Sequence, residues 1–237
     1  GGGLWLSGDG DVLRISVDDN TASSNGGGSY VNGTLSAKHT TFNSNHTDTN
    51  GGGLWFNGDL DLDSSNVDLN SSGNNGAGIY GDGVLNMTFS NVDDNSSDND
   101  GGGLWWGSGQ VTVERSQVRR NHASRGGGVF ILAENPIFQF DEFSSNNAVT
   151  IGGGLYISKQ SAASSTPILF NSTVVYNTAA VLGSGLLCTY LTNPVVQNSI
   201  FWGNLAADGV QMHLQGGSEI FVTYSDVAGG QSGIVGF

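Results

Sequence analysis

Acidic side chains recur in this chain directly after a valine, at a spacing that would gather carboxylates along one line. The residues concerned are Asp18, Asp19, Asp68, Asp93 and Asp94. Carboxylates held about 5 Å apart repel one another unless they are hydrated, paired with a base or bridged by a cation such as calcium. The sequence therefore predicts either a weak calcium site among these aspartates or their neutralisation by neighbouring arginines.

Basic side chains form one cluster, which consists of Arg115, Arg119, Arg120, His122 and Arg125. Arg119 and Arg120 follow Val118 as Asp93 and Asp94 follow Val92, so ion pairing is the simpler explanation of both pairs. A polysaccharide lyase needs a base and a bridged substrate carboxylate, and a glycoside hydrolase needs two carboxylates at a defined gap. We find no Ser-His-Asp or Cys-His set, and we expect no catalytic residues.

A repeat of about 25 residues must position all of these side chains. Glycine triplets begin at Gly1, Gly26, Gly51, Gly101, Gly126 and Gly152, with GAG at Gly76 and GSG at Gly183. A second landmark, V/F-x-x-N, recurs in step with the triplets. A fixed period of this kind indicates a stacked repeat architecture.

Short apolar runs alternate within each repeat, as Leu54 and Phe56 do around Trp55. Alternation of this kind is typical of β-strands, and the Gly, Asn and Asp residues between the runs favour turns. The sequence therefore predicts an all-β, single-stranded parallel β-helix of about nine coils, with 1–237 as one domain. We expect an insertion around Lys159 to Pro167, a degenerate ninth coil with Gly230 in the asparagine position, and a further triplet beginning at Gly236.

The asparagines of the second landmark should form a buried ladder, in which each amide bonds to the coils above and below. The members are Asn20, Asn45, Asn70, Asn95, Asn121, Asn146, Asn177 and Asn204. We expect a structural role for this ladder.

Aromatic side chains should form a second column on the outer surface, because each lies between two inward residues. The members are Trp5, Tyr30, Trp55, Tyr80, Trp105, Phe130 and Tyr156. Their rings can stack on one another along the sheet, or offer an exposed stripe to another protein, to a second copy or to the flat faces of sugar rings. The two interpretations are compatible.

The net charge of −14, with seven Lys and Arg residues, disfavours nucleic acid and anionic membrane surfaces as partners. No membrane span is visible, and Cys188 is the only cysteine. The chain starts inside a repeat without an evident cap, so we expect excised or processed ends. Glycosylation sequons occur at Asn32 and Asn86, whereas those at Asn45, Asn70 and Asn95 fall in the buried ladder.

The pairing of GGG-[LIV]-aromatic with [FV]-x-x-N resembles the GGA-[ILV] and FxxN repeats of chlamydial polymorphic outer membrane proteins. It is also similar to the wider set of bacterial secreted right-handed parallel β-helix repeat proteins, which share the pectate-lyase-like superfamily fold. The tail, NSIFWGN and VTYSDVAGG, resembles the end of such helices in anchored surface proteins. This resemblance implies a right-handed β-helix at the cell surface. The third residue here is usually Gly rather than Ala, so chlamydial adhesion is not carried over.

Two classes of function remain open. The first is an extracellular structural or adhesive rod, either monomeric or stacked head to tail into a surface filament, with other copies or other surface proteins as partners. The second is a carbohydrate-binding or polysaccharide-degrading β-helix protein with glycans as ligands. We expect no cofactor other than calcium and no direct insertion into a membrane.

Overall fold

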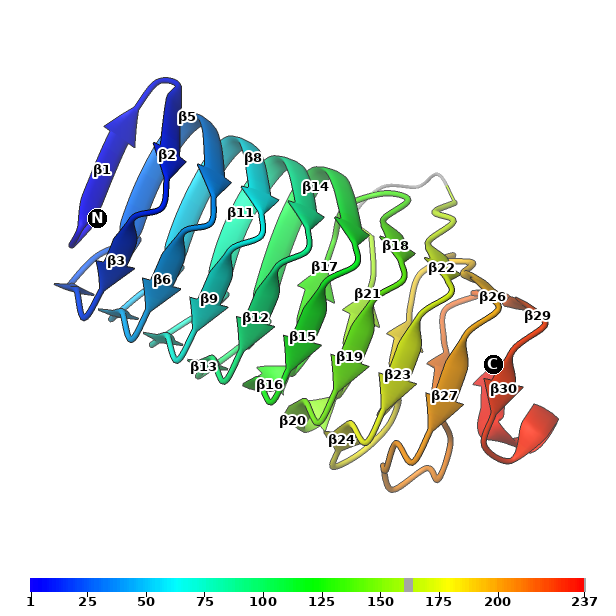
Figure 1. The fold of residues 1–237 in the computed structure, drawn as a ribbon. Helices are drawn as coiled ribbons and strands as arrows, with labels where there is room; N and C mark the ends of the chain where they lie inside the picture. The colour runs from blue at the N-terminus through cyan, green and yellow to red at the C-terminus, as the bar shows by residue number, and fades with distance from the viewer. Residues whose placement is uncertain (160–163, 237) are drawn as a thin grey trace.

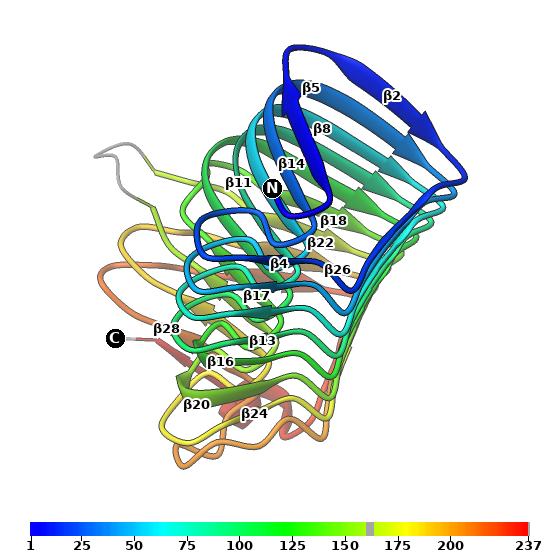
Figure 2. The same ribbon diagram turned by 90° about the vertical axis from the view of Figure 1, so that its left-hand side faces the viewer.

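The computed structural model describes residues 1–159 and 164–236, which form a parallel β-solenoid. Its coils stack along one axis, with the first residue at one end of the stack and the last described strand at the other (Figure 1). The view turned by 90° shows the coils following the same closed outline (Figure 2). We number the coils from their glycine triplets, so that coil five begins at Gly101 and coil six at Gly126.

Three parallel sheets run along the solenoid, and we call them A, B and C. Sheet A has 15 strands and contains the residues that follow each glycine triplet. Its strands are β1 (Leu4–Ser7), β2 (Gly10–Leu13), β5 (Ser29–Lys38), β8 (Leu54–Asp63), β11 (Ile79–Thr88), β14 (Leu104–Glu114), β17 (Val129–Ile131), β18 (Ile137–Gln139), β21 (Leu155–Ile157), β22 (Ile168–Phe170), β25 (Leu186–Cys188), β26 (Val195–Gln197), β28 (Met212–Leu214), β29 (Phe221–Thr223) and β31 (Ile234–Gly236).

Sheet B has nine strands and carries the valine or phenylalanine of the second landmark. Its strands are β3 (Ser16–Asp18), β6 (Thr41–Asn43), β9 (Asn66–Asp68), β12 (Asn91–Asp93), β15 (Gln117–Arg119), β19 (Glu142–Ser144), β23 (Thr173–Val175), β27 (Ile200–Trp202) and β30 (Asp226–Val227). The nine strands confirm a count of about nine coils.

Sheet C has seven short strands, which follow the ladder asparagines. They are β4 (Thr21–Ala22), β7 (His46–Thr47), β10 (Ser71–Ser72), β13 (Ser96–Ser97), β16 (His122–Arg125), β20 (Asn147–Ile151) and β24 (Thr178–Ala179). The one helix among the described residues is the 3₁₀ helix η1 (Gly230–Gly233). None of the described helical residues form a segment long and apolar enough to span a membrane.

In coils two to five, the two apolar runs of each repeat join into one strand of 10 or 11 residues. Each of these strands bends at a glycine with positive φ, such as Gly33 (146°) and Gly58 (138°). A Cβ at Gly58 would lie against the carbonyl oxygen of Gly33 in the preceding coil. The bend therefore needs glycine for its backbone conformation and for the close approach of neighbouring coils.

The interior is one continuous apolar column. Leu54 and Phe56 of β8 are fully buried on one side of the strand, and Val67 of sheet B packs in the same core cluster. The register keeps equivalent residues stacked, as Leu54 pairs with Ile79 and Val67 with Val92. Equivalent inward residues of successive coils therefore lie directly above one another in the core.

The ninth coil is present, because β29 pairs with β26 and β30 with β27. The expectation of a further triplet at Gly236 is wrong, since Ile234 already lies in register with Met212. Gly230 is not followed by a full turn: Gly230–Gly233 instead forms the short helix η1, which shortens the connection into β31. Of the expected insertion around Lys159 to Pro167, residues 160–163 lie outside the described residues.

Candidate functional site

The asparagine ladder uses its amides within the solenoid. The Asn70 backbone N–H and side-chain Nδ2 both donate to Asn95 Oδ1 at 2.9 Å, and Asn95 Nδ2 donates to the Val67 carbonyl at 2.8 Å. The same pattern joins the landmark asparagines from Asn20 to Asn204. Asn20 is half-buried, while the other seven are buried. The geometry assigns these side chains to coil-to-coil bonding.

The ladder ends at Gln211, a residue that the sequence analysis did not single out. Gln211 Oε1 accepts both the Asn204 backbone N–H (3.1 Å) and Asn204 Nδ2 (2.9 Å), and its Nε2 donates to the Asn204 carbonyl (3.2 Å). The Gln211 side chain therefore accepts the two hydrogen bonds that the asparagine of the next coil accepts elsewhere in the ladder.

A second polar ladder was also missed, although its signal is a small hydroxyl residue two positions before the landmark valine or phenylalanine. In it, each serine hydroxyl oxygen accepts a backbone N–H from the preceding coil and donates to the carbonyl two residues earlier, while Thr40 at the start of the ladder donates to the Lys38 carbonyl. Ser65, for example, accepts from Thr40 and donates to Asp63. The members are Thr40, Ser65, Ser90, Ser116, Ser172, Ser199 and Ser225, with Asp141 in the equivalent place in coil six.

The outward aromatic column is a stack of rings that face one another. Neighbouring rings from Trp5 to Phe130 are separated by 4.3–6.5 Å between centroids and inclined by 3–11°. Because the ring faces between Trp5 and Phe130 cover one another, the inner members offer solvent their edges. Trp5 is 65% exposed and stacks on Tyr30.

The expectation that the whole column is exposed is wrong at its C-terminal end. Phe130 and Tyr156 are only 5% and 8% exposed, and they meet edge to face at 82°. Leu132, Ile151, Leu182 and Leu187 pack around these two rings as a satellite apolar cluster. Of the remaining rings, Trp5 is exposed and those of Tyr30, Trp55, Tyr80 and Trp105 are half-buried.

The acidic column lies on the outer face of sheet B, where it lines an open groove of about 490 Å³ across coils one to five. Three of these aspartates accept, through Oδ1, a backbone N–H from the next coil: Asp18 from Asn43 (3.0 Å), Asp68 from Asp93 (3.2 Å) and Asp93 from Arg119 (3.1 Å). These contacts hold the carboxylates along the groove floor.

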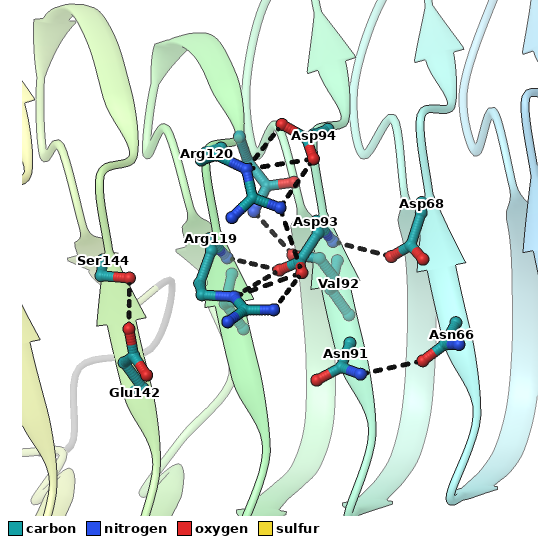
Figure 3. Close-up of polar contacts among 12 residues, drawn as sticks. Asn66, Asp68, Asn91, Val92, Asp93, Asp94, Arg119, Arg120, Glu142 and Ser144 are labelled. Atoms are coloured by element: carbon teal, nitrogen blue, oxygen red, sulfur yellow. Dashed lines mark hydrogen bonds and ion pairs between the residues drawn. The ribbon is translucent and has the colours of Figure 1, made fainter.

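Two arginines neutralise one end of the groove (Figure 3). Arg119 Nη2 lies 2.6 Å from Asp93 Oδ2, and Arg120 Nη2 lies 2.8 Å from Asp94 Oδ2 and 3.4 Å from Asp93 Oδ2. Asp93 is buried, so its pairing with Arg119 prevents an isolated charge in a dry site. The register places these ion pairs where the sequence analysis expected them.

Asp68 is the carboxyl group of the groove with the most altered acidity. Burial, followed by the charge of Asp93, raises its pKa to about 6. Asp93 beside it is paired with Arg119. Two neighbouring carboxyl groups in different environments are the usual basis of acid and base assignments in catalytic sites.

The calcium candidates Asp18, Asp19, Asp68, Asp93 and Asp94 do not converge on one point. Among residues 1–159 and 164–236, no group of three or more His, Cys, Asp or Glu side chains is arranged to hold a metal ion. Asp93 and Asp94 are bound by arginines instead, because Arg119 and Arg120 follow them in register in the next coil. A calcium ion at these two positions would have to displace the guanidinium groups.

The remaining arginines of the basic cluster also have partners. Arg125 donates to both carboxylate oxygens of Asp100 at 2.7 and 2.6 Å and lies over the Phe130 ring. Arg115 pairs with Glu114, and its guanidinium group lies between the rings of Phe89 and Phe140. The cluster is thus bound within the solenoid.

The outer face of sheet B changes character after coil six, which the sequence analysis also missed. In the columns that carry polar residues in the early coils, Ile200 and Trp202 appear, and Tyr176 follows the landmark in coil seven. Tyr176 is 63% exposed and Trp202 50% exposed. We call Tyr176, Ile200 and Trp202 the apolar patch. In the sequence, the patch is indicated by the replacement of polar residues by apolar ones around the V/F-x-x-N landmark.

The two candidate glycosylation residues both point outward. Asn32 accepts a hydrogen bond from Asn57 Nδ2, and Asn86 Nδ2 donates to Asp61. Both are exposed, whereas Asn45, Asn70 and Asn95 are buried in the ladder. Access therefore remains only at the first two of these five sequons.

One family model matches the chain: the model described as a right-handed beta helix region covers residues 52–227. No curated protein and no solved structure gave a match. The matched segment includes coils three to eight and the β-strands of the ninth.

Proposed function

The chain belongs to the right-handed β-helix family, and from that premise we propose that it is an extracellular structural or adhesive rod, with 1–237 acting as one domain. The observation that carries this proposal is the asparagine ladder, which joins every coil to the next through buried amides from Asn20 to Gln211. Side chains used in this way stiffen a stack along its axis. The outer faces remain available to partners.

The adhesive part of the proposal is supported by the apolar patch. Exposed aromatic and aliphatic side chains gathered on a flat sheet are unusual on a soluble surface and mark sites of protein interaction. Tyr176, Ile200 and Trp202 lie on neighbouring strands or their ends, because β23 pairs with β27. We propose other surface proteins, or a second copy, as partners.

Head-to-tail assembly is a further form of the same proposal. Strand β29 pairs with β26 alone among the described strands, and Ile220, Val222 and Val227 line an open hollow beside it. Unpaired strand edges and uncovered core favour the addition of another coil. The first coil of a second copy offers complementary apolar positions in Leu6 and Val12.

Immunogold electron microscopy of intact cells that make this chain tests location and assembly together. We expect gold on the outer surface, and along filaments if copies stack; in purified material the filament repeat would be about 40 Å, the length of nine coils at the spacing of β-strands. Labelling that requires permeabilised cells would overturn the extracellular role. Light scattering that shows only monomers at micromolar concentration would overturn the filament.

A second candidate is a polysaccharide-active protein, and Asp68 is the observation that favours it. A carboxyl group with a pKa of about 6 beside Asp93, which is paired with Arg119, in a polar groove, has the chemistry of an acid catalyst. Release of reducing ends or unsaturated uronates from neutral and acidic polysaccharides, with and without calcium, should then depend on Asp68. Asp68→Asn should abolish product, whereas Asp59→Asn, outside the groove, should not. Absence of product from the native chain would remove this candidate.

A further inference from the structure

The hydroxyl ladder is interrupted chemically at one coil. Ser116 in coil five donates its hydroxyl to the Glu114 carbonyl at 3.0 Å, and Ser172 in coil seven donates to the Phe170 carbonyl at 3.1 Å. Between them, coil six has Asp141, whose side chain is buried at 3% exposure. An acidic side chain thus occupies a place that is otherwise filled by a hydroxyl group.

Asp141 reproduces only part of the bonding pattern. Its Oδ1 accepts the Ser116 backbone N–H at 2.9 Å, and its own N–H donates to Ser172 Oγ at 3.4 Å. Its Oδ2 is buried and has no hydrogen-bond partner among the described residues. An unpartnered buried carboxylate oxygen is costly, because the desolvation of the charge is not compensated.

A proton on Oδ2 would supply what is missing. The serines of the ladder both accept a backbone N–H and donate to the carbonyl two residues earlier, and for Asp141 that carbonyl belongs to Gln139. A carboxylic acid can accept through Oδ1 and donate through Oδ2, whereas a carboxylate can only accept. We propose that Asp141 is a proton-operated latch: when protonated, it makes the hydroxyl ladder continuous from coil five to coil seven, and when ionised, it loosens that joint.

The charged surroundings favour the protonated form. Coil five presents Glu114, which is paired with Arg115, and the Arg115 guanidinium is already stacked between Phe89 and Phe140. On its own strand, Glu142 accepts a hydrogen bond from Ser144. In coil seven, β22 and β23 with the residues that join them (168–175) contain no charged side chain. No cation is therefore bound to Asp141 in the described part of the chain.

Burial, with a smaller contribution from Glu114, raises the pKa of Asp141 to about 7, against the lowering effect of the Ser116 and Gln139 backbone. An unfolded aspartate titrates near 3.9. Because the folded state holds its proton more tightly, the stabilisation is complete below about pH 4. It is lost as the pH rises through about 7. The latch therefore closes in acid and opens on the alkaline side of neutrality.

Amide hydrogen exchange of the full chain, corrected for the intrinsic effect of pH, tests the latch. The Ser116 and Asp141 amides should lose protection on the order of tenfold or more between pH 5.5 and 8.5. The Leu54 amide in coil three, which is bonded to the Gly78 carbonyl in sheet A, serves as the internal reference. Equal pH dependence at coil three and coil six would overturn the proposal.

Two variants separate the latch from other titrations. Asp141→Asn keeps one acceptor and one donor without a charge, and Asp141→Ser restores the residue of the neighbouring coils. Both should hold the two amides equally protected across the pH range, even though Asp68 still titrates. If either folds and keeps the wild-type pH dependence at coil six, the latch is refuted.

A direct titration needs no variant. The side-chain carboxyl ¹³C resonance of Asp141 in the native protein should change with a midpoint near pH 7. A midpoint below about 5 would mean that the group is ionised throughout the physiological range, which would overturn the proposal. The proposal is independent of whether the solenoid is an adhesin, a filament subunit or an enzyme.

Discussion

The first five coils and the last four stack in the same way, but repeat length and strand length are more regular in the first five. Ladder asparagines from Asn20 to Asn146 follow one another at 25 or 26 residues, and the next two steps are 31 and 27. Strands in sheet A shrink from 10 or 11 residues to three after coil five. The inner ladder is nevertheless continuous across both regions, so changes in length are absorbed at the outer corners.

The outer surface shows the opposite behaviour. The aromatic rings stack in parallel through the first region and on to Phe130 of coil six, and beyond it the same column contains Tyr156 turned edge-on, then Leu187 and His213. Sheet B changes from a charged groove to the apolar patch. The comparison shows that inward positions are constrained by the neighbouring coils, whereas outward positions are free to diversify.

The largest expected effect tests whether the ladder carries equal weight in both regions. Asn95→Ala and Asn177→Ala should each lower the free energy of unfolding by about 4 kcal/mol, because each leaves several buried donors and acceptors unpaired. Urea unfolding followed by circular dichroism measures both. Asn91→Ala, which removes one outward side-chain bond to Asn66, is the control and should cost less than about 1 kcal/mol. A loss of unfolding free energy for Asn177→Ala much smaller than that for Asn95→Ala would show that the ladder contributes less to stability in the second region.

A pair of glycine substitutions separates crowding from backbone conformation. A Cβ at Gly78 would lie 2.5 Å from the Gly103 carbonyl oxygen and 3.0 Å from Asn95 Nδ2, whereas one at Gly209 would meet nothing within 4 Å. Gly78→Ala should cost about 3 kcal/mol through overpacking. Gly209→Ala should cost about 1 kcal/mol for its φ of 70° alone. Thermal unfolding of the two variants side by side provides the measurement, and similar losses would contradict the distinction.

Two tryptophans compare the outer surfaces. Trp55 lies between Tyr30 and Tyr80 in the stack, so Trp55→Ala should cost about 2 kcal/mol in lost ring contacts and buried area. Trp202 is half exposed, and Trp202→Ala should cost less than about 1 kcal/mol while weakening any partner bound at the apolar patch. Unfolding curves give the stability term. Equal costs would mean that the second surface is as tightly packed as the first.

The smallest effect concerns the charged groove. The pKa of Asp68 is raised to about 6 in the folded state, so ionisation lowers stability as the pH rises from about 4 to 6. Asp68→Asn should remove this penalty and stabilise the chain at pH 8 by about 1 kcal/mol, after allowance for solvent screening, with little effect at pH 4. Denaturation at both pH values tests the sign. A loss of stability at pH 8 would show that the Asp68 charge is compensated in a way the geometry does not reveal.

The coils, the strands and the positions of the ladder asparagines follow from the sequence because each repeat obeys the same local rule. The positions occupied by Gly53 and Asn70 in coil three recur in the other repeats at nearly fixed distances from the landmark valine or phenylalanine. Stacking of the coils then places each of these residues over its equivalent in the preceding coil. The predicted strand order in sheet B needs no information from distant parts of the chain.

The remaining features depend on contacts that cross from one corner to another. Phe130 and Tyr156 are buried by Leu132 and Leu182, which come from outer turns without a fixed place in the repeat. The ionisation of Asp68 reflects its depth in the groove rather than its position in the motif. The turn at Gly230 is a 3₁₀ helix, at the place where the preceding coils have a ladder asparagine. Periodicity cannot encode such exceptions.

Gln211 has a use in protein engineering. In other coils the third glycine of the triplet is small because an asparagine amide fills the space above it, as Asn204 lies 2.9 Å from where a Cβ at Gly185 would be. Gln211 stands in line with Gly185 and turns its own amide into that space. Its side-chain bonds close on Asn204 within seven residues, while its backbone N–H donates to Gly233 and β28 pairs with β31. A designer of β-solenoids could therefore graft residues 204–236 onto another array to end its asparagine ladder.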